Sequence, residues 1–225
     1  MFNTPKNTVE FRVWGKFALF TDPITKLGGE KCSYQIPTYE AVKGITESIY
    51  WKPTFIWIID KVRVMKSIEM EVKGVRTLKY YGGNGGLYYY TYLKDVEYQV
   101  QAHFEWNENM PELKKDQNDG KHFEIAERSL EKGGRRDIFL GTRECQGYVE
   151  PCKFGESVGY YDNNLLSFGS MFYNFGYPNE TGKKELVARI WLNADMKNGI
   201  IDFTDKNNDI KERIIKPMQQ ENQYL

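Results

Sequence analysis

The sequence predicts an α+β fold from the period of its apolar residues. Apolar and polar residues alternate over 9–14, which is the pattern of a half-buried strand. Apolar residues recur at helical spacing in 38–52, where Thr38 is the expected cap, and again in 121–132, which ends before Gly133. We therefore expect strands to alternate with two helices in the N-terminal part of the chain.

Further strands are indicated by runs of β-branched and aromatic residues. Such runs occur at 55–65 and 94–106, and another begins at Ile138 and is expected to continue toward Val149. Glycine-rich turns and a tyrosine run within about 68–92 indicate an inserted β-hairpin. The order β-α-β, insertion, β-α-β is that of a ferredoxin-like (RRM-like, split βαβ) domain.

The C-terminal third differs in character from residues 1–150. From Pro151 onward, Gly and Asn clusters separate short aromatic or β-branched runs, which predicts a small antiparallel β-sheet domain over 151–225. The polar tail after Pro217 is expected to fray. We therefore expect two domains, with the hairpin belonging to the first.

Charge and cysteine content exclude several classes of protein. Basic and acidic residues both number 31, so any nucleic-acid binding must come from a local patch. The 3 cysteines form no C-x-x-C pair, which argues against a disulfide framework or a structural zinc site and fits a reducing cytoplasm. The N-terminus has no apolar signal region, and no run reaches the roughly 18 apolar residues that a membrane span needs. We expect a cytoplasmic protein with no membrane partner.

A candidate anion site lies where the second predicted helix begins. Asp119 is the expected cap, which leaves backbone N–H groups and the positive end of the helix dipole beside Lys121 and His122. A phosphate fits such a site, and the imidazole adds a group that changes charge near neutral pH. The alternative is a solvated first turn. His103, the other histidine, falls on the polar face of a strand and is interpreted as a surface residue.

Tyr50 closes the first predicted helix, because Pro53 forces this helix to finish near Trp51 or Lys52. Tyr50 lies about 100° around the helix from Ile49, so its ring is expected at the rim of the buried face with its hydroxyl free to reach outward. The alternative is that Tyr50 is only a packed residue at the helix end.

Two groups of basic residues are candidates for contacts with nucleic acid. Residues 52–79 hold seven basic side chains against three acidic ones, and Lys73 and Arg76 are among them, although a solvated strand edge has the same charge pattern. Arg135 and Arg136 follow the second helix and either bind phosphates or pair with neighbouring carboxylates. The tyrosines of the hairpin either stack on unpaired bases or cover one another across strands.

Several strings in the chain resemble one family when they are taken together. They are FALFTDP (17–23), PTYEAVKG (37–44), ESIYWKPT (47–54), YLKDV (92–96), GKH (120–122) and RRDIFLGTRECQGYV (135–149). They are similar to the CRISPR-associated Cas-five proteins of the Dvulg, or type I-C, subtype, which belong to the RAMP superfamily of ferredoxin-like RNA-binding proteins. The similarity covers about residues 8–192. It implies an endoribonuclease that cuts precursor CRISPR RNA within the repeat hairpin, and then holds the 5′ handle of the mature guide RNA beside other protein subunits of the type I-C surveillance complex.

The resemblance also implies active-site residues, because the tyrosine, lysine and histidine implicated in the family match Tyr50, Lys121 and His122. RNA supplies its own nucleophile, the 2′-hydroxyl, so geometry, proton transfer and phosphorane stabilisation suffice, and no metal or other cofactor is expected. His122 is the choice for proton transfer and Lys121 for neutralising the phosphorane. Tyr50 orients the 2′-hydroxyl or joins in proton transfer, and the roles of base and acid stay unassigned between Tyr50 and His122.

Two other functions remain open from the sequence. A non-catalytic scaffold subunit would bind the guide-RNA handle without cutting it, and the presence of all three active-site residues favours cleavage over this reading. A metal-dependent nuclease would need converging carboxylates, and no Asp-x-Asp type of acidic cluster stands out on one predicted element.

Overall fold

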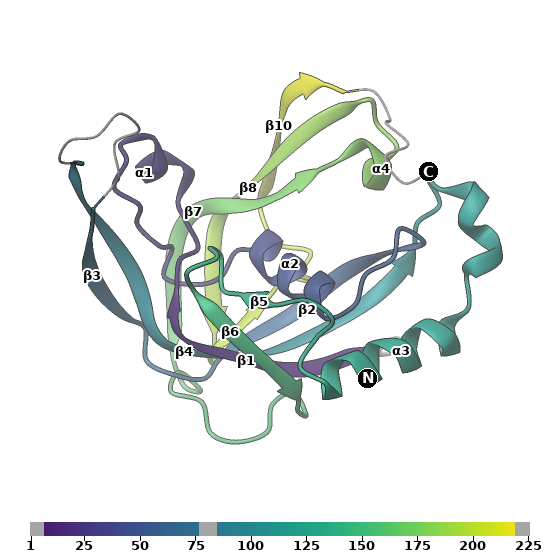
Figure 1. Cartoon of the computed structure of the whole chain (residues 1–225), viewed down its shortest axis with the longest axis horizontal. Coiled ribbons are helices and arrows are strands. Elements are labelled where there is room, and N and C mark those ends of the chain that lie inside the picture. Colours follow the sequence, from purple (N-terminus) through teal and green to yellow (C-terminus); the bar gives the residue numbers. More distant parts are fainter. Residues whose placement is uncertain (1–6, 77–84, 219–225) are drawn as a thin grey trace.

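A computed structural model describes residues 7–76 and 85–218 of the chain (Figure 1). The strands are β1 (Val9–Ala18), β2 (Phe55–Val64), β3 (Glu69–Arg76), β4 (Leu87–Trp106), β5 (Ile138–Phe139), β6 (Gln146–Pro151), β7 (Leu165–Gly176), β8 (Glu185–Lys197), β9 (Ile200–Asp202) and β10 (Ile210–Pro217). The helices are α1 (Pro23–Leu27), α2 (Tyr39–Ile49), the 3-10 helix η1 (Pro111–Asp116), α3 (Asp119–Glu131) and α4 (Pro178–Thr181). No helix in this part of the chain is long and apolar enough to cross a membrane.

The strands form one 10-stranded sheet in the order β10-β8-β9-β2-β4-β1-β6-β5, with β3 added to β4 and β7 added to β8. All of these strand pairs are antiparallel. Helix α2 lies against β2, α3 lies against β1 and β6, and the two helices contact each other. The predicted α+β class is therefore confirmed. Both helices pack their buried apolar residues into the same hydrophobic core.

Helix α2 forms as its sequence pattern predicts, but it ends earlier. The Thr38 side chain accepts a hydrogen bond from the backbone N–H of Ala41 at 3.1 Å, and the apolar face of the helix is buried. The helix stops at Ile49, and Tyr50 follows in an extended conformation with φ −157° and ψ 131°. The expected end near residue 51 or 52 is therefore wrong, and Tyr50 leaves the helical path.

Helix α3 also has the predicted apolar face, but its cap is Asn118 rather than Asp119. The Asn118 side chain accepts from the backbone N–H of Lys121 at 3.0 Å. At the other end, the N–H groups of Gly133 and Gly134 return to the carbonyls of Leu130 and Ser129, with φ values of 81° and 101° at the two glycines. This is a Schellman ending, so the predicted termination by glycine is confirmed.

The inserted hairpin is built from β3 and the first half of β4. Strand β4 is continuous over 20 residues, so the separate strands expected at 88–92 and 94–106 are one strand. Its second half pairs with both β1 and β2 in the body of the sheet. The glycine turn expected at 82–86 falls largely on residues 77–84, which lie outside the described residues.

The single strand expected from Ile138 toward Val149 is instead two strands, β5 and β6, which pair with each other. The chain reverses between them, because the Leu140 N–H bonds to the Cys145 carbonyl at 2.8 Å. Gly141 makes this possible, since its φ is 94° and a Cβ there would lie 2.1 Å from the Leu19 carbonyl oxygen. Apolar runs on both sides of a tight turn look like one strand in the sequence.

The segment from residue 151 onward forms the antiparallel strands β7 to β10 that its short apolar runs predict. Strand β9 pairs with β2, so these strands continue the sheet of the N-terminal part. Residues 219–225 of the predicted frayed tail lie outside the described residues.

Candidate active site

Tyr50 and His122 meet inside the protein, although they are 72 positions apart in the sequence. The Tyr50 hydroxyl lies 2.7 Å from Nδ1 of His122. The exposed fractions are 1% for Tyr50 and 0% for His122. The structure thus brings together two of the three residues expected to act on RNA, at the end of α2 and the start of α3.

Tyr50 is held by the backbone as well as by its ring. Its carbonyl accepts a hydrogen bond from the indole N–H of Trp57 at 2.7 Å, which ties the end of α2 to β2. Three other aromatic side chains surround the imidazole, with ring centroids 5.4 to 6.4 Å away: Phe55, Phe104 and Trp106. The imidazole therefore has a fixed plane in an apolar pocket.

The second ring nitrogen of His122 contacts η1. Nε2 lies 2.8 Å from the backbone carbonyl oxygen of Asp116. A carbonyl oxygen can only accept, so Nε2 carries a proton. In the neutral imidazole, Nδ1 then accepts a hydrogen bond that the Tyr50 hydroxyl donates.

Burial raises the pKa of the Tyr50 hydroxyl above its ordinary value. The Arg135 guanidinium, 4.7 Å from the centroid of the Tyr50 ring, opposes this rise, and the Asp116 carboxylate adds to it. Because the pKa of a free tyrosine is already near 10, Tyr50 stays protonated at neutral pH. In this arrangement the Tyr50 hydroxyl is a hydrogen-bond partner that fixes the position of the His122 ring.

Lys121 contacts the same residue of η1 as His122 does. Its ammonium group forms an ion pair with the Asp116 carboxylate, which also accepts a hydrogen bond from the Thr54 hydroxyl at 3.0 Å. The hydrogen bond from Lys121 is the main reason why the pKa of Asp116 is lowered. The side chain of Lys121 is 51% exposed, so it can reach a ligand at the surface.

Asp116 therefore closes the site, since its backbone carbonyl and its carboxylate lie 2.8 and 3.3 Å from Nε2 of His122, and the carboxylate also holds Lys121 and Thr54. Sequence reasoning missed Asp116 because it lies in a polar stretch without periodicity, and only the fold brings it to His122. The prediction that the Tyr50 hydroxyl is free at an exposed rim is wrong, because the early end of α2 turns the ring inward. A solvated first turn describes Lys121 but not His122.

His103 is not the free surface residue expected from its place on a strand. Its Nδ1 lies 2.9 Å from the Asp60 carboxylate on the neighbouring β2, and the side chain is 13% exposed. This hydrogen-bonded carboxylate raises the pKa of His103 against the effect of burial. Strand alternation predicted the face of His103 but not its cross-strand partner.

The basic residues expected to contact RNA lie in two places. On the hairpin, Lys73 has its ammonium group 3.1 Å from the centroid of the Phe17 ring, and Arg76 is exposed at the end of β3. Beside the buried pair, Arg135 covers Tyr50, while Arg136 is exposed and donates its backbone N–H to Ser48. Within the described residues, neither Arg135 nor Arg136 forms an ion pair with a carboxylate.

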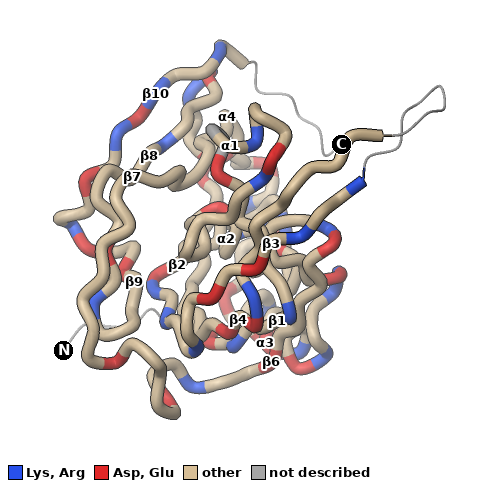
Figure 2. The backbone as a smooth tube through the Cα atoms, turned by 90° about the vertical axis from the view of Figure 1, so that its left-hand side faces the viewer, with Lys and Arg blue, Asp and Glu red and all other residues tan. Residues whose placement is uncertain are grey.

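Four of the seven basic residues expected to give a surplus over 52–79 form ion pairs within the described part of the fold. Lys61, Arg63 and Lys66 each pair with a carboxylate from elsewhere in the chain, at 3.2, 2.7 and 2.9 Å. Basic and acidic residues are interspersed along the chain (Figure 2). Lys79 lies outside the described residues. Among the residues that the structure describes, no group of three or more His, Cys, Asp or Glu side chains could hold a metal ion.

The site thus joins a tyrosine after α2 to a histidine in the first turn of α3, over an antiparallel sheet. The chain matches the family described as CRISPR-associated protein (Cas_Cas5) over residues 8–204. It therefore belongs to the Cas5 family of CRISPR-associated proteins.

Individual relatives cover nearly the whole chain. The CRISPR pre-crRNA endoribonuclease Cas5d of Mannheimia succiniciproducens is 32% identical over 87% of this chain and 94% of its own length. The protein of the same description from Thermus thermophilus is 30% identical over 80% of this chain and 79% of its own length. A crystal structure of a CRISPR-associated protein has a TM-score of 0.76 and 38% identity, covering 91% of this chain and 96% of that one.

Proposed function

We propose that this chain is an endoribonuclease that cleaves precursor CRISPR RNA within the repeat hairpin by attack of the RNA 2′-hydroxyl. The observation that carries the proposal is the 2.7 Å contact between Tyr50 and His122, beside Lys121. Relatives at 32% and 30% identity are named pre-crRNA endoribonucleases, which supports the same activity here. After cleavage the chain holds the 5′ handle of the mature guide RNA as a subunit of the type I-C surveillance complex.

The proposed fold is a ferredoxin-like domain over residues 1–150 with the hairpin inserted, followed by a small antiparallel domain over 151–225. The strand order β2-β4-β1-β6, with α2 between β1 and β2 and α3 between β4 and β6, supports the split βαβ arrangement. Strands β7 to β10 all lie beyond β2 in the sheet, which supports the division. The free cysteines Cys32, Cys145 and Cys152 fit the reducing conditions of the cytoplasm, where we propose that the protein acts.

In the proposed reaction, the 2′-oxygen attacks the adjacent phosphorus and the bond from phosphorus to the 5′-oxygen breaks. The proton of the 2′-hydroxyl passes to a base, and the leaving 5′-oxygen receives a proton from an acid. The products are a 2′,3′-cyclic phosphate and a 5′-hydroxyl. The reaction needs no metal ion, because the nucleophile is part of the RNA and Lys121 can neutralise the phosphorane.

We take Nε2 as the nitrogen of His122 that acts on RNA, because Nε2 faces η1 and the residue that pairs with the exposed Lys121, whereas Nδ1 is occupied by Tyr50. RNA must first displace the Asp116 carbonyl from Nε2. The Tyr50 hydroxyl both donates and accepts, so it can hold the imidazole with the proton on either nitrogen. Tyr50 thus supports His122 both as a base and as an acid.

The proposal predicts that cleavage continues in EDTA and stops when the scissile nucleotide has a 2′-deoxy sugar. The measurement uses purified protein with a repeat-hairpin RNA and its 2′-deoxy counterpart, together with analysis of the product ends. Binding of both RNAs is expected to be nearly equal. Cleavage of the deoxy RNA would refute internal attack, loss of cleavage in EDTA would favour a metal-dependent nuclease, and binding without cleavage would favour a scaffold.

The Asp116→Asn variant is expected to bind the repeat RNA about threefold more tightly at low salt. The Asp116 carboxylate competes with phosphate for Lys121, and the amide would not. Because folding lowers the pKa of Asp116, its stabilising charge is present above a pH of about 4 and is lost as the pH falls through the folded pKa. The gain should fade at high salt, which screens exposed charges. Equal or weaker binding at neutral pH and low salt would contradict the role of Asp116 as a competitor.

A further inference from the structure

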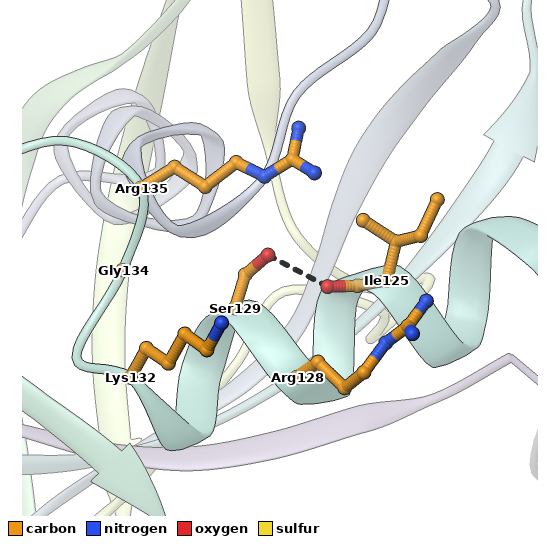
Figure 3. Close-up of a pocket in the computed structure, with 6 residues that line it drawn as sticks. All are labelled: Ile125, Arg128, Ser129, Lys132, Gly134 and Arg135. Atoms are coloured by element: carbon orange, nitrogen blue, oxygen red, sulfur yellow. Dashed lines mark hydrogen bonds between the residues drawn. The ribbon is translucent and has the colours of Figure 1, made fainter.

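A second pocket, with a volume of about 380 Å³, lies along the C-terminal half of α3. Figure 3 shows its six lining residues, which are Ile125, Arg128, Ser129, Lys132, Gly134 and Arg135. The first four belong to one stripe of the helix, because they follow the spacing i, i+3, i+4 and i+7. Three of the six side chains are cationic.

These three cations have no carboxylate partner within the described residues. Arg128 donates only to the backbone carbonyl of Glu124, at 3.2 Å, and the hydroxyl of Ser129 is turned to the carbonyl of Ile125. Arg128, Lys132 and Arg135 are all exposed. The contrast with the paired cations of β2 indicates a surface that is complementary to an anion.

The pocket borders the buried pair. Arg135 lines the pocket and also covers the Tyr50 ring, with its guanidinium carbon 4.7 Å from the ring centroid. A helix rises about 1.5 Å per residue, so Arg128 and Lys132 lie about 9 and 15 Å along the axis of α3 from His122. A nucleic-acid strand that passes the buried pair along α3 would meet these cations next.

We propose that this pocket binds the sugar-phosphate backbone of the substrate RNA, a few nucleotides from the scissile bond. The guanidinium groups of Arg128 and Arg135 match the geometry of a phosphate, and Lys132 adds a point charge. Ile125 offers an apolar wall for a ribose. The contact is to the backbone, so it raises affinity and fixes the position of the strand without reading its sequence. This inference rests on the proposed function, because it takes RNA to be the substrate.

A structural role is the competing explanation, since cations near the C-terminus of a helix interact favourably with its dipole. That role predicts a loss of thermal stability and no loss of RNA affinity. The two explanations therefore differ in what the same variant changes.

The test is the double variant Arg128→Gln, Lys132→Gln, compared with the wild type at several salt concentrations. The RNA carries a 2′-deoxy sugar at the scissile nucleotide, so that binding is measured without cleavage. We expect the affinity for this RNA to fall about tenfold. The slope of log affinity against log salt concentration should become shallower by about 1.4, because each phosphate contact on a single strand contributes about 0.7. The melting temperature should stay near wild type.

The matched control is Lys211→Gln, Arg213→Gln, which removes the same charge from exposed positions on β10. Unchanged affinity and slope in the α3 variant, or an equal loss in the control, would overturn the proposal. If the wild-type protein does not cut RNA, but the salt dependence of its RNA binding depends on Arg128 and Lys132, the proposed nuclease activity is refuted and the proposed binding pocket is supported. Wild-type protein that cuts, with an α3 variant that binds normally, would refute only the pocket.

Discussion

Replacing His122 with glutamine is expected to lower the single-turnover cleavage rate by about 10²- to 10⁴-fold, the range for a lost proton-transfer group. Glutamine is chosen because its amide can still donate to the Asp116 carbonyl and fill part of the pocket, but it cannot titrate. Alanine would leave a cavity among aromatic rings and two buried groups without partners, at a cost of about 1–3 kcal/mol for each group. RNA affinity should stay within a few-fold of wild type.

The other histidine provides the matched control for this variant. His103 lies on β4 and is hydrogen-bonded to Asp60, away from the buried pair. His103→Gln should therefore leave the cleavage rate within a few-fold of wild type. Equal losses in the two variants, or a His122→Gln protein that cuts at the normal rate, would remove His122 from the reaction.

Removing one oxygen in the Tyr50→Phe variant is expected to slow single-turnover cleavage by about 10²-fold or more. The ring keeps its packing against Phe55 and its contact with Arg135, but Nδ1 of His122 loses its partner. A buried nitrogen without a hydrogen bond costs about 1–3 kcal/mol, and the imidazole loses the hydroxyl that can hold it with the proton on either nitrogen. We propose that RNA affinity depends on exposed cations, so it should change little.

Tyr39→Phe is the control for this loss of a buried hydroxyl. Tyr39 begins α2, is 7% exposed, and its hydroxyl accepts from the backbone N–H of Ile59 at 3.3 Å. Both variants lose a buried hydrogen bond, but only Tyr50 touches His122. A Tyr50→Phe protein that cuts within a few-fold of Tyr39→Phe would show that the Tyr50 hydroxyl has no part in the reaction.

The helices and most strands were predictable because each has an apolar period that is visible in a short stretch of sequence. Thr38 caps the start of α2, and Gly133 ends α3, each through a hydrogen bond to a residue close by in the sequence. Both of these helix ends were therefore predicted correctly. The choice of Asn118 over Asp119 as cap was not predictable, because either side chain can accept the same hydrogen bond. The division of 138–149 into two strands depends on a turn that packs against Leu19, far away in the sequence.

The candidate site was predictable only in part. The chemistry was indicated by the residue types and the family strings of Tyr50, Lys121 and His122. The order of helices and strands predicted that both helices pack on the same face of the sheet. Their burial and the closure by Asp116 follow from contacts between α2, η1 and α3, which no local period reveals. The same reason explains why the charges of Lys61 and Arg63 looked available, since their carboxylate partners lie more than 90 positions away.

The closure of His122 by Asp116 has a consequence for which RNA molecules are cut. An RNA must displace a hydrogen bond of about 0.5–1.5 kcal/mol, and an ion pair beside it, before a phosphate can reach Nε2. A repeat hairpin that makes many contacts can supply this free energy from its binding, whereas a random transcript that touches the protein weakly cannot. The resting enzyme would thus spare cellular RNA by induced fit, and its selectivity would appear in the cleavage rate as well as in affinity.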